Sequence, residues 1–232
     1  MPAAKRGPDS RTFILIPGAG GAASWYWHRV VPLLRQAGHE TITVDLPAAD
    51  PAAGLPEYVR LVASAAGDRN DAVLVAASLG GFTAPMVAAQ RPLAGIILVN
   101  AMIPAPGETP RAWWDNTGQP QAQRAAAEQG GYGTDFDLDT YFLHDVPPDV
   151  VASGEGQQQA EADAVFESAC EFTAWPDVPT WVVAGLGDRF FPAGFQQQVA
   201  RERLGIEADL LPGGHLIALA QPDLLARYLL NA

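Results

Sequence analysis

Three side chains whose types and order suit nucleophilic catalysis lie far apart in the sequence. Ser78 stands in the run VLVAASLGG, Asp188 in AGLGDRFFP and His215 in LPGGHL. A serine hydroxyl is a weak nucleophile until a histidine takes its proton, and the histidine needs a carboxylate to orient it. The chain order serine, acid, histidine is one in which such a trio occurs. The residues therefore predict acyl transfer, with Ser78 as nucleophile, His215 as general base and Asp188 as orienting acid.

The residues next to Ser78 are small, as a sharp strand-to-helix turn requires. Ala76 and Gly80 lie two residues before and after the serine and must pass each other closely if the hydroxyl stands at the apex. Each member of the trio has a simpler interpretation. Ser78 and Asp188 could only cap the helices that follow them, and His215 could be a solvated loop residue. Their joint presence favours catalysis.

A glycine-rich loop, PGAGG at residues 17–21, follows the first apolar run of the chain. Such loops expose backbone N–H groups, which can stabilise an oxyanion. The expected donors are the N–H groups of Ala19 and Leu79, and we expect Gly20 to contact substrate. A dinucleotide site is the alternative for a glycine-rich loop. It is disfavoured because bulky aromatic residues follow, in place of the G-x-G-x-x-G opening of a helix.

Apolar runs that alternate with helical patterns must position these residues. The predicted strands are residues 12–16, 41–44, 72–76, 95–99, 180–184 and 207–211. The predicted helices are residues 24–36 with Ser24 as N-cap, 57–66, 79–90, 193–203 and 222–230. This order predicts an α/β fold, doubly wound, with a six-stranded, mainly parallel sheet. Only about ten residues precede the first strand, too few for an additional antiparallel hairpin.

One long segment interrupts the alternation of strands and helices. Residues 103–176 contain no clear strand and are too long for an ordinary connection, so we expect a helical cap inserted into a core made of residues 1–102 and 177–232. The aromatic residues of this cap could line an apolar substrate pocket or could equally form the cap's own core; the candidate substrate contacts are Trp113, Trp114, Tyr141 and Phe142. His144 and Asp145 could also reach the site, although contacts within the cap are the simpler interpretation.

Together these segments resemble the α/β-hydrolase superfamily over nearly the whole chain, and most closely its branch of methylesterases and hydroxynitrile lyases with their actinobacterial relatives. The resemblance rests on PGAG (17–20) with WYW (25–27), GHE (38–40), VDL (44–46), ASLGG (77–81), GLGDRFFP (185–192) and GGH (213–215). The family often has His-Gly after its first strand, where this chain has Pro17. Lyase members carry a lysine beside the catalytic histidine and a hydroxyl residue in the oxyanion loop, where this chain has Leu216 and Ala19. The resemblance therefore favours hydrolysis.

Composition excludes several other classes of protein. The chain has 232 residues, of which 48% are hydrophobic, and a net charge of −12, so we expect no binding to nucleic acid or to anionic membranes. Residues 1–10 lack an apolar stretch typical of a signal peptide, and one cysteine, Cys170, excludes an internal disulfide; both favour a cytoplasmic protein. The histidines show no metal-ligand spacing, and the predicted chemistry needs no metal or cofactor. A homodimer is left open.

The predicted function is a serine hydrolase acting on a small apolar or aromatic carboxylic ester through an acyl-enzyme, so the predicted partner is a small-molecule ester. Two alternatives remain. The same fold and residues could perform C–C bond hydrolysis, lyase chemistry or perhydrolysis. The chain could also be a ligand-binding protein without catalysis, although such a protein has no reason to keep Ser78, Asp188 and His215 together.

Overall fold

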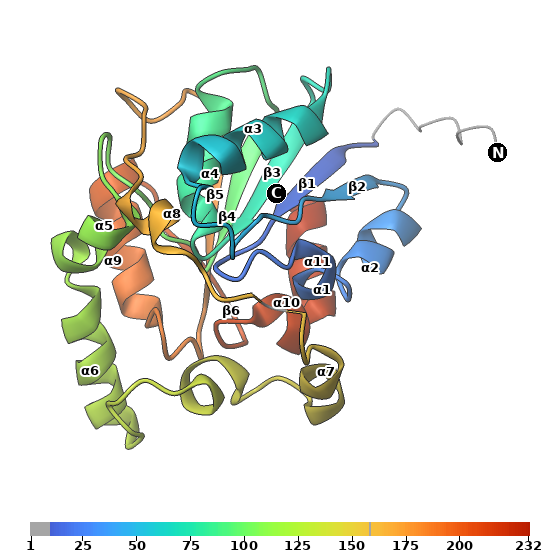
Figure 1. Ribbon diagram of the computed structural model, residues 1–232. Coiled ribbons are helices and arrows are strands. Elements are labelled where there is room, and N and C mark those ends of the chain that lie inside the picture. Colours follow the sequence, from blue (N-terminus) through green and yellow to red (C-terminus); the bar gives the residue numbers. More distant parts are fainter. Residues whose placement is uncertain (1–9, 158) are drawn as a thin grey trace.

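The computed structural model describes residues 10–157 and 159–232, and Figure 1 shows their course. Its sheet has the strand order β2-β1-β3-β4-β5-β6, and every neighbouring pair is parallel. The strands are β1 (Thr12–Ile16), β2 (Glu40–Thr43), β3 (Ala72–Ala77), β4 (Gly95–Val99), β5 (Thr180–Gly185) and β6 (Asp209–Leu211). The predicted six-stranded parallel sheet is confirmed. Most of the N-terminal stretch on which the signal-peptide prediction rests lies outside the described residues.

Both faces of the sheet are covered by helices, because strand side chains alternate between two apolar layers. In β1, Ile14 and Ile16 pack on one face of the sheet, which α3 (Leu55–Ala66) and α4 (Gly80–Ala88) cover. Phe13 and Leu15 pack on the other face, which α2 (Val31–Gln36) and α11 (Pro222–Asn231) cover. The helices that flank the sheet are α1 (Ala23–Tyr26), α2 (Val31–Gln36), α3 (Leu55–Ala66), α4 (Gly80–Ala88), α9 (Ala193–Leu204), α10 (Ile217–Ala220) and α11 (Pro222–Asn231). The buried central strands therefore need apolar residues on both faces, as their sequences have.

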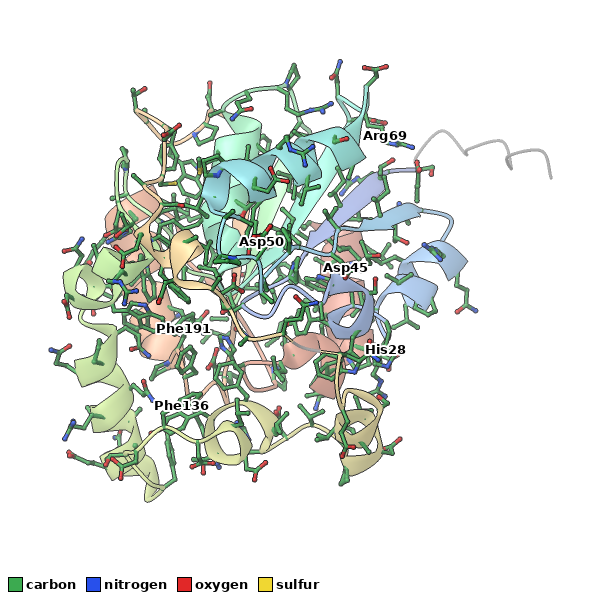
Figure 2. The ribbon with its side chains drawn as sticks, in the orientation of Figure 1. His28, Asp45, Asp50, Arg69, Phe136 and Phe191 are labelled. Carbon is green, nitrogen blue, oxygen red and sulfur yellow. The ribbon has the colours of Figure 1, made fainter. Side chains whose placement is uncertain are left out.

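The predicted helix over residues 24–36 is wrong, because two short helices, α1 and α2, take its place. Pro32 explains the break: proline has no N–H to donate to the carbonyl four residues earlier, and its ring clashes with that carbonyl. The predicted N-cap is also wrong. Ser24 lies inside α1, and its hydroxyl donates to Oδ2 of Asp45 at 2.6 Å, beside α1 in Figure 2. The remaining predicted boundaries shift by a few residues.

The segment between β4 and β5 contains no strand among its described residues, as expected. It carries α5 (Pro110–Thr117), α6 (Gln119–Gly130), the short π-helix η1 (Asp139–Leu143), α7 (Pro148–Ser153) and α8 (Asp163–Glu167). In Figure 1 it descends past α9, crosses below β6 and α10, and returns in front of the sheet. Because all strands are parallel, their carboxyl ends lie at the same edge of the sheet, and the loops that follow β1, β3, β5 and β6 begin there. This edge collects the candidate site residues.

Candidate active site

Ser78 stands at the apex of a tight turn between β3 and α4. Its φ of 48° lies in the left-handed region, which a residue with a side chain rarely adopts. The turn depends on glycine: a Cβ at Gly18 would lie 2.8 Å from the Cβ of Ser78, and a Cβ at Gly80 would lie 2.5 Å from the carbonyl oxygen of Pro17. The small residues at these positions therefore allow the first loop and the serine turn to meet.

His215 and Asp188 approach Ser78 from the loops after β6 and β5. The Nε2 of His215 lies 3.1 Å from the Oγ of Ser78, and its Nδ1 lies 2.8 Å from the Oδ2 of Asp188. The side chain of His215 is 1% exposed and that of Asp188 is fully buried, so bulk water does not compete for the contact between them. The three predicted residues thus form one continuous hydrogen-bonded chain.

The Asp188 carboxylate is held in one orientation by its other partners. Its Oδ1 accepts the backbone N–H groups of Phe190 and Phe191 at 2.9 and 2.8 Å, and its Oδ2 also accepts the Nε2 of Gln196 at 3.1 Å. Aromatic rings surround the imidazole of His215, among them Phe142 with a centroid distance of 4.7 Å. The acid therefore binds its own loop and the histidine at once, and the ring is confined.

The first loop presents backbone N–H groups beside the serine. Among the described residues, the N–H groups of Ala19 and Leu79 donate no hydrogen bond, so both are free to bind an oxyanion. The N–H of Gly20 is occupied, since it donates to the Oε2 of Glu161 at 2.7 Å. Gly20 still lines the cavity.

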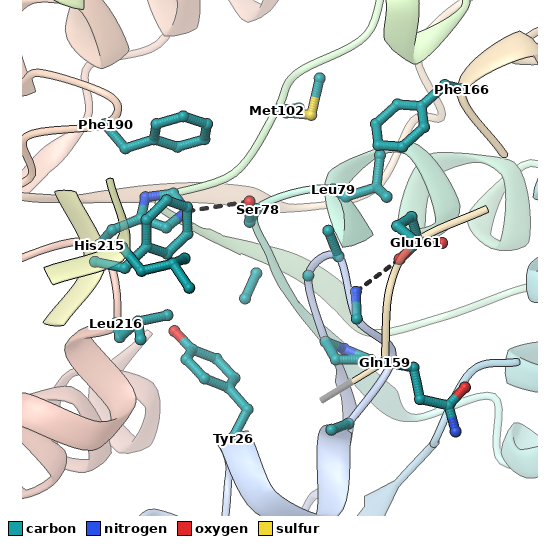
Figure 3. A pocket seen from close by; sticks show the side chains of 18 of the residues that line it. Tyr26, Ser78, Leu79, Met102, Gln159, Glu161, Phe166, Phe190, His215 and Leu216 are labelled. Carbon is teal, nitrogen blue, oxygen red and sulfur yellow. Dashed lines mark hydrogen bonds between the residues drawn. The ribbon is translucent and has the colours of Figure 1, made fainter. Parts of the chain in front are cut away.

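A cavity of about 310 Å³ opens above Ser78 (Figure 3). Most of its wall is apolar, and Trp114 and Phe142 belong to it, as predicted. Tyr26 contributes a hydroxyl, and burial, together with the nearby Asp188 and Asp145 carboxylates, raises its pKa, so this hydroxyl stays protonated. The cavity therefore combines apolar walls with a few polar groups, as is usual for a small-molecule site.

Trp113 and Tyr141, two other predicted substrate contacts, do not line this cavity. The indole N–H of Trp113 donates to the carbonyl of Ile103 at 3.0 Å, and its ring packs against Phe191 and Phe195. Tyr141 is fully buried and its hydroxyl donates to the carbonyl of Gly133 at 2.7 Å. Both side chains form the core behind the wall, which corrects the prediction for these two positions.

Comparison with known proteins assigns a family to this fold and site. Residues 13–228 match the sequence profile of the Alpha/beta hydrolase family. The chain belongs to the alpha/beta hydrolase family. The hydrolase is 30% identical over 242 aligned residues to a pyrethroid hydrolase of Sphingobium wenxiniae, an alignment that spans 92% of this chain and 84% of the relative. The resemblance predicted from the sequence motifs is thereby confirmed.

Solved structures share the fold of this hydrolase at lower identity. A polyneuridine aldehyde esterase superposes with a TM-score of 0.75 and 16% identity, covering 96% of this chain and 98% of that one. A methylesterase of Arabidopsis superposes with a TM-score of 0.73 and 21% identity, covering 95% and 98%. Both likenesses extend over almost the whole chain, including the segment between β4 and β5.

Several residues that hold the hydrolase site together were not predicted for that role. Asn100 has a φ of 45° at the end of β4, and its Nδ2 donates to the carbonyl oxygens of Gly214 and His215, both at 3.0 Å. Asp145 accepts the N–H of Gly214 at 2.6 Å through Oδ2. A polar residue directly after an apolar strand was the available signal for Asn100. For His144 and Asp145 the simpler interpretation, contacts within the cap, is wrong: Asp145 binds the histidine loop, and the Nε2 of His144 lies 3.1 Å from the carbonyl oxygen of Gly187.

Residues 10–157 and 159–232 contain no cluster of three or more His, Cys, Asp or Glu side chains that could hold a metal ion. They also contain no helix long and apolar enough to span a membrane.

Proposed function

We propose that this protein is a serine hydrolase that cleaves a carboxylic ester through an acyl-enzyme. The observation that carries the proposal is the buried chain from Asp188 through His215 to Ser78, which ends beside two unpaired N–H groups in an apolar cavity. Two relatives, a pyrethroid hydrolase of Sphingobium wenxiniae and a probable esterase of rice, support the same reaction class.

Each residue takes the role for which its contacts suit it. His215 Nε2 accepts the proton of Ser78 Oγ as the oxygen attacks the ester carbonyl carbon, and the N–H groups of Ala19 and Leu79 donate to the resulting oxyanion. Asp188 stabilises the protonated imidazole and holds its Nδ1–H. The imidazolium then protonates the departing alcohol, leaving an ester between Ser78 and the acyl group.

A water molecule completes the cycle. His215 takes a proton from the water as its oxygen attacks the acyl carbon, and the same two N–H groups bind the second oxyanion. The carboxylic acid leaves as Ser78 regains its proton from His215. Every proton in this scheme moves between Nε2 of His215 and an oxygen at the site, so the scheme calls on no metal and no organic cofactor.

The proposed substrate is a small ester with an apolar or aromatic group. A volume of about 310 Å³ and a wall that includes Trp114 and Phe142 support this class. The segment of residues 103–176 acts as a cap in this proposal, because it supplies these two side chains. We also propose a cytoplasmic location for the protein and a homodimer as one assembly.

Ester turnover by the wild-type protein and by Ser78→Ala tests the proposal. A panel of p-nitrophenyl esters with acetyl, butyryl, octanoyl and benzoyl groups should be hydrolysed by the wild-type protein, and apolar or aromatic acyl groups should be preferred. The Ser78→Ala variant should fold normally and hydrolyse none of them above the rate of the buffer. Equal turnover by the variant would show that another group performs the reaction.

A further inference from the structure

Glu161 brings a carboxylate into the cavity wall, across Ser78 from His215 in Figure 3. Its Oε2 accepts a hydrogen bond from the N–H of Gly20 at 2.7 Å, and its Oε1 accepts a hydrogen bond from the hydroxyl of Tyr58. Both carboxylate oxygens are therefore satisfied by groups outside the segment that carries Glu161. One of those groups belongs to the loop that presents the N–H of Ala19.

The chain around Glu161 binds this loop at a second point. The backbone N–H of Gln159 donates to the carbonyl of Gly20 at 3.3 Å, so both backbone polar groups of Gly20 are occupied by residues 159–161. The N–H of Ala162 anchors the same stretch by donating to the carbonyl of Ala48 at 2.7 Å. The inserted segment therefore holds the oxyanion loop through its own backbone and through one carboxylate.

The loop needs such an external constraint because of its own sequence. Gly20 and Gly21 have φ values of 88° and 69°, and glycine loses more conformational freedom on ordering than any other residue. The N–H of Gly20 belongs to the planar peptide group that follows Ala19, so fixing that N–H restricts the backbone of Ala19. On the other side of Ala19, Gly18 is packed against Ser78. Glu161 thus completes the fixation of Ala19.

The position of Glu161 carries a cost that its hydrogen bonds offset. Burial raises the pKa of its carboxyl group, while the hydrogen bonds from Tyr58 and Gly20 lower it, and burial is the larger effect. A carboxylate in an apolar wall is unfavourable unless it is paired with donors. An apolar residue at this position would avoid the cost but would leave the N–H of Gly20 without its acceptor.

We propose that Glu161 is a positioning residue for the ester hydrolysis proposed above: it holds Gly20 so that the N–H of Ala19 stays directed at the oxyanion. The inference rests on that proposed function. It also assigns the amide of Gly20 to the loop's support, which leaves Ala19 and Leu79 as the oxyanion donors. Glu161 acts through the loop and takes no proton from the substrate.

Two substitutions separate the hydrogen bond from the charge. Glu161→Ala removes the acceptor and should lower kcat about 10- to 100-fold with KM within about 3-fold, because the misplaced donor serves the transition state. Glu161→Gln keeps a carbonyl for Gly20, and its amide can donate to the hydroxyl of Tyr58. This variant should keep kcat within about 3-fold of wild type.

An inhibitor that forms an oxyanion gives the decisive readout. The serine oxygen attacks the carbonyl carbon of an aryl trifluoromethyl ketone. The ketone oxygen then becomes an oxyanion at the place where the oxyanion of the ester forms. The affinity of the ketone should fall in Glu161→Ala by the same factor as kcat/KM, whereas general loosening of the cap would change KM instead. Should Glu161→Ala fail to fold by circular dichroism, Glu161→Leu, which fills the space without an acceptor, carries the same expectation.

Glu167 offers a matched control, because it lies in the same segment and also pairs through its carboxylate. Its partner is Arg111, both side chains are exposed, and neither residue lines the cavity. Glu167→Ala should therefore keep wild-type kcat and inhibitor affinity. Wild-type kcat in Glu161→Ala, or a loss in Glu161→Gln as large as in Glu161→Ala, would overturn the inference. Failure of a fluorophosphonate to label Ser78 in the wild-type protein would instead overturn the proposed function.

Discussion

Asp188→Asn is expected to lower kcat by about ten thousand-fold while leaving the fold intact. The structure decides how the new amide must sit. The backbone N–H groups of Phe190 and Phe191 both donate to Oδ1, so the amide oxygen has to take that place. The NH₂ group then replaces Oδ2, opposite the Nδ1 of His215. His215 must accept there, its proton moves to Nε2, and it can no longer take the proton of Ser78.

The opposite orientation of the amide is no better. It would leave the two backbone donors of Phe190 and Phe191 buried without an acceptor, at a cost of about 1–3 kcal/mol each. The NH₂ group in the first orientation also faces Gln196, whose Nε2 donates to Oδ2 at 3.1 Å in the native protein. A ten-thousand-fold loss corresponds to about 5.4 kcal/mol in the barrier, which is the scale of these opposing costs.

The loss of kcat in Asp188→Asn is measured from initial rates on the p-nitrophenyl ester that the wild-type protein hydrolyses best. Thermal melting verifies that the variant is folded. Asp145→Asn is the matched control: Asp145 lies beside the histidine loop, and an amide oxygen can still accept the N–H of Gly214. We expect that control to keep kcat within about 10-fold. The assignment of the acid would be refuted if Asp188→Asn kept kcat within about 10-fold of wild type. It would also be refuted if Asp145→Asn lost more activity than Asp188→Asn.

Neighbouring tryptophans should respond differently to truncation: Trp114→Ala should change the ranking of kcat/KM among esters, whereas Trp113→Ala should lower stability by about 3–5 kcal/mol and keep that ranking. Melting curves measure the stability of both variants, and an ester panel measures their ranking of kcat/KM. A wild-type ranking in Trp114→Ala would contradict the expectation for Trp114. Arg203→Met should lower stability at pH 7 by about 3 kcal/mol, because it leaves the buried carboxylate of Glu108 without its charged partner. Denaturant titrations from pH 7 to 3 should show that difference shrinking as Glu108 takes up a proton.

The contacts of Glu108 determine how its ion pair with Arg203 depends on pH. Burial opposes its ionisation, but hydrogen bonds from Arg203, Asn116 and the N–H of Ala105 outweigh burial and hold its pKa below the ordinary value of 4.5. A carboxyl group with a depressed pKa contributes stability above its unfolded pKa and loses that contribution as pH falls through the folded pKa. The ion pair should therefore matter most at neutral pH, and a difference that grows toward acid would contradict the argument.

The sequence predicted most of the sheet and the three residues of the hydrogen-bonded chain, because their signals are local. Buried parallel strands appear as apolar runs, and Ser78, Asp188 and His215 each stand in a loop directly after such a run. The division of residues 24–36 into two helices was also readable in principle, since Pro32 marks it. Local geometry alone, without knowledge of tertiary contacts, suffices for such features.

Other features depend on contacts between distant segments, and the sequence carries no trace of them. Glu161 and Gly20 are separated by 141 positions, and only the path of the inserted segment brings them together. Trp113 and Trp114 are adjacent, and successive residues of a helix point about 100° apart, so one faces the cavity and the other the core. Their identical residue type could not tell which one faces the substrate.

Covalent labelling with a fluorophosphonate tests the central proposal most directly. The reagent phosphonylates a serine whose proton is taken by a neighbouring base, so it reports the nucleophile without knowledge of the natural substrate. Intact-mass spectrometry should show one adduct on the wild-type protein, and peptide mapping should place it on Ser78. Ser78→Ala should remain unlabelled. An adduct on a different serine, or no adduct on the folded wild-type protein, would contradict the assignment of Ser78 as an activated nucleophile.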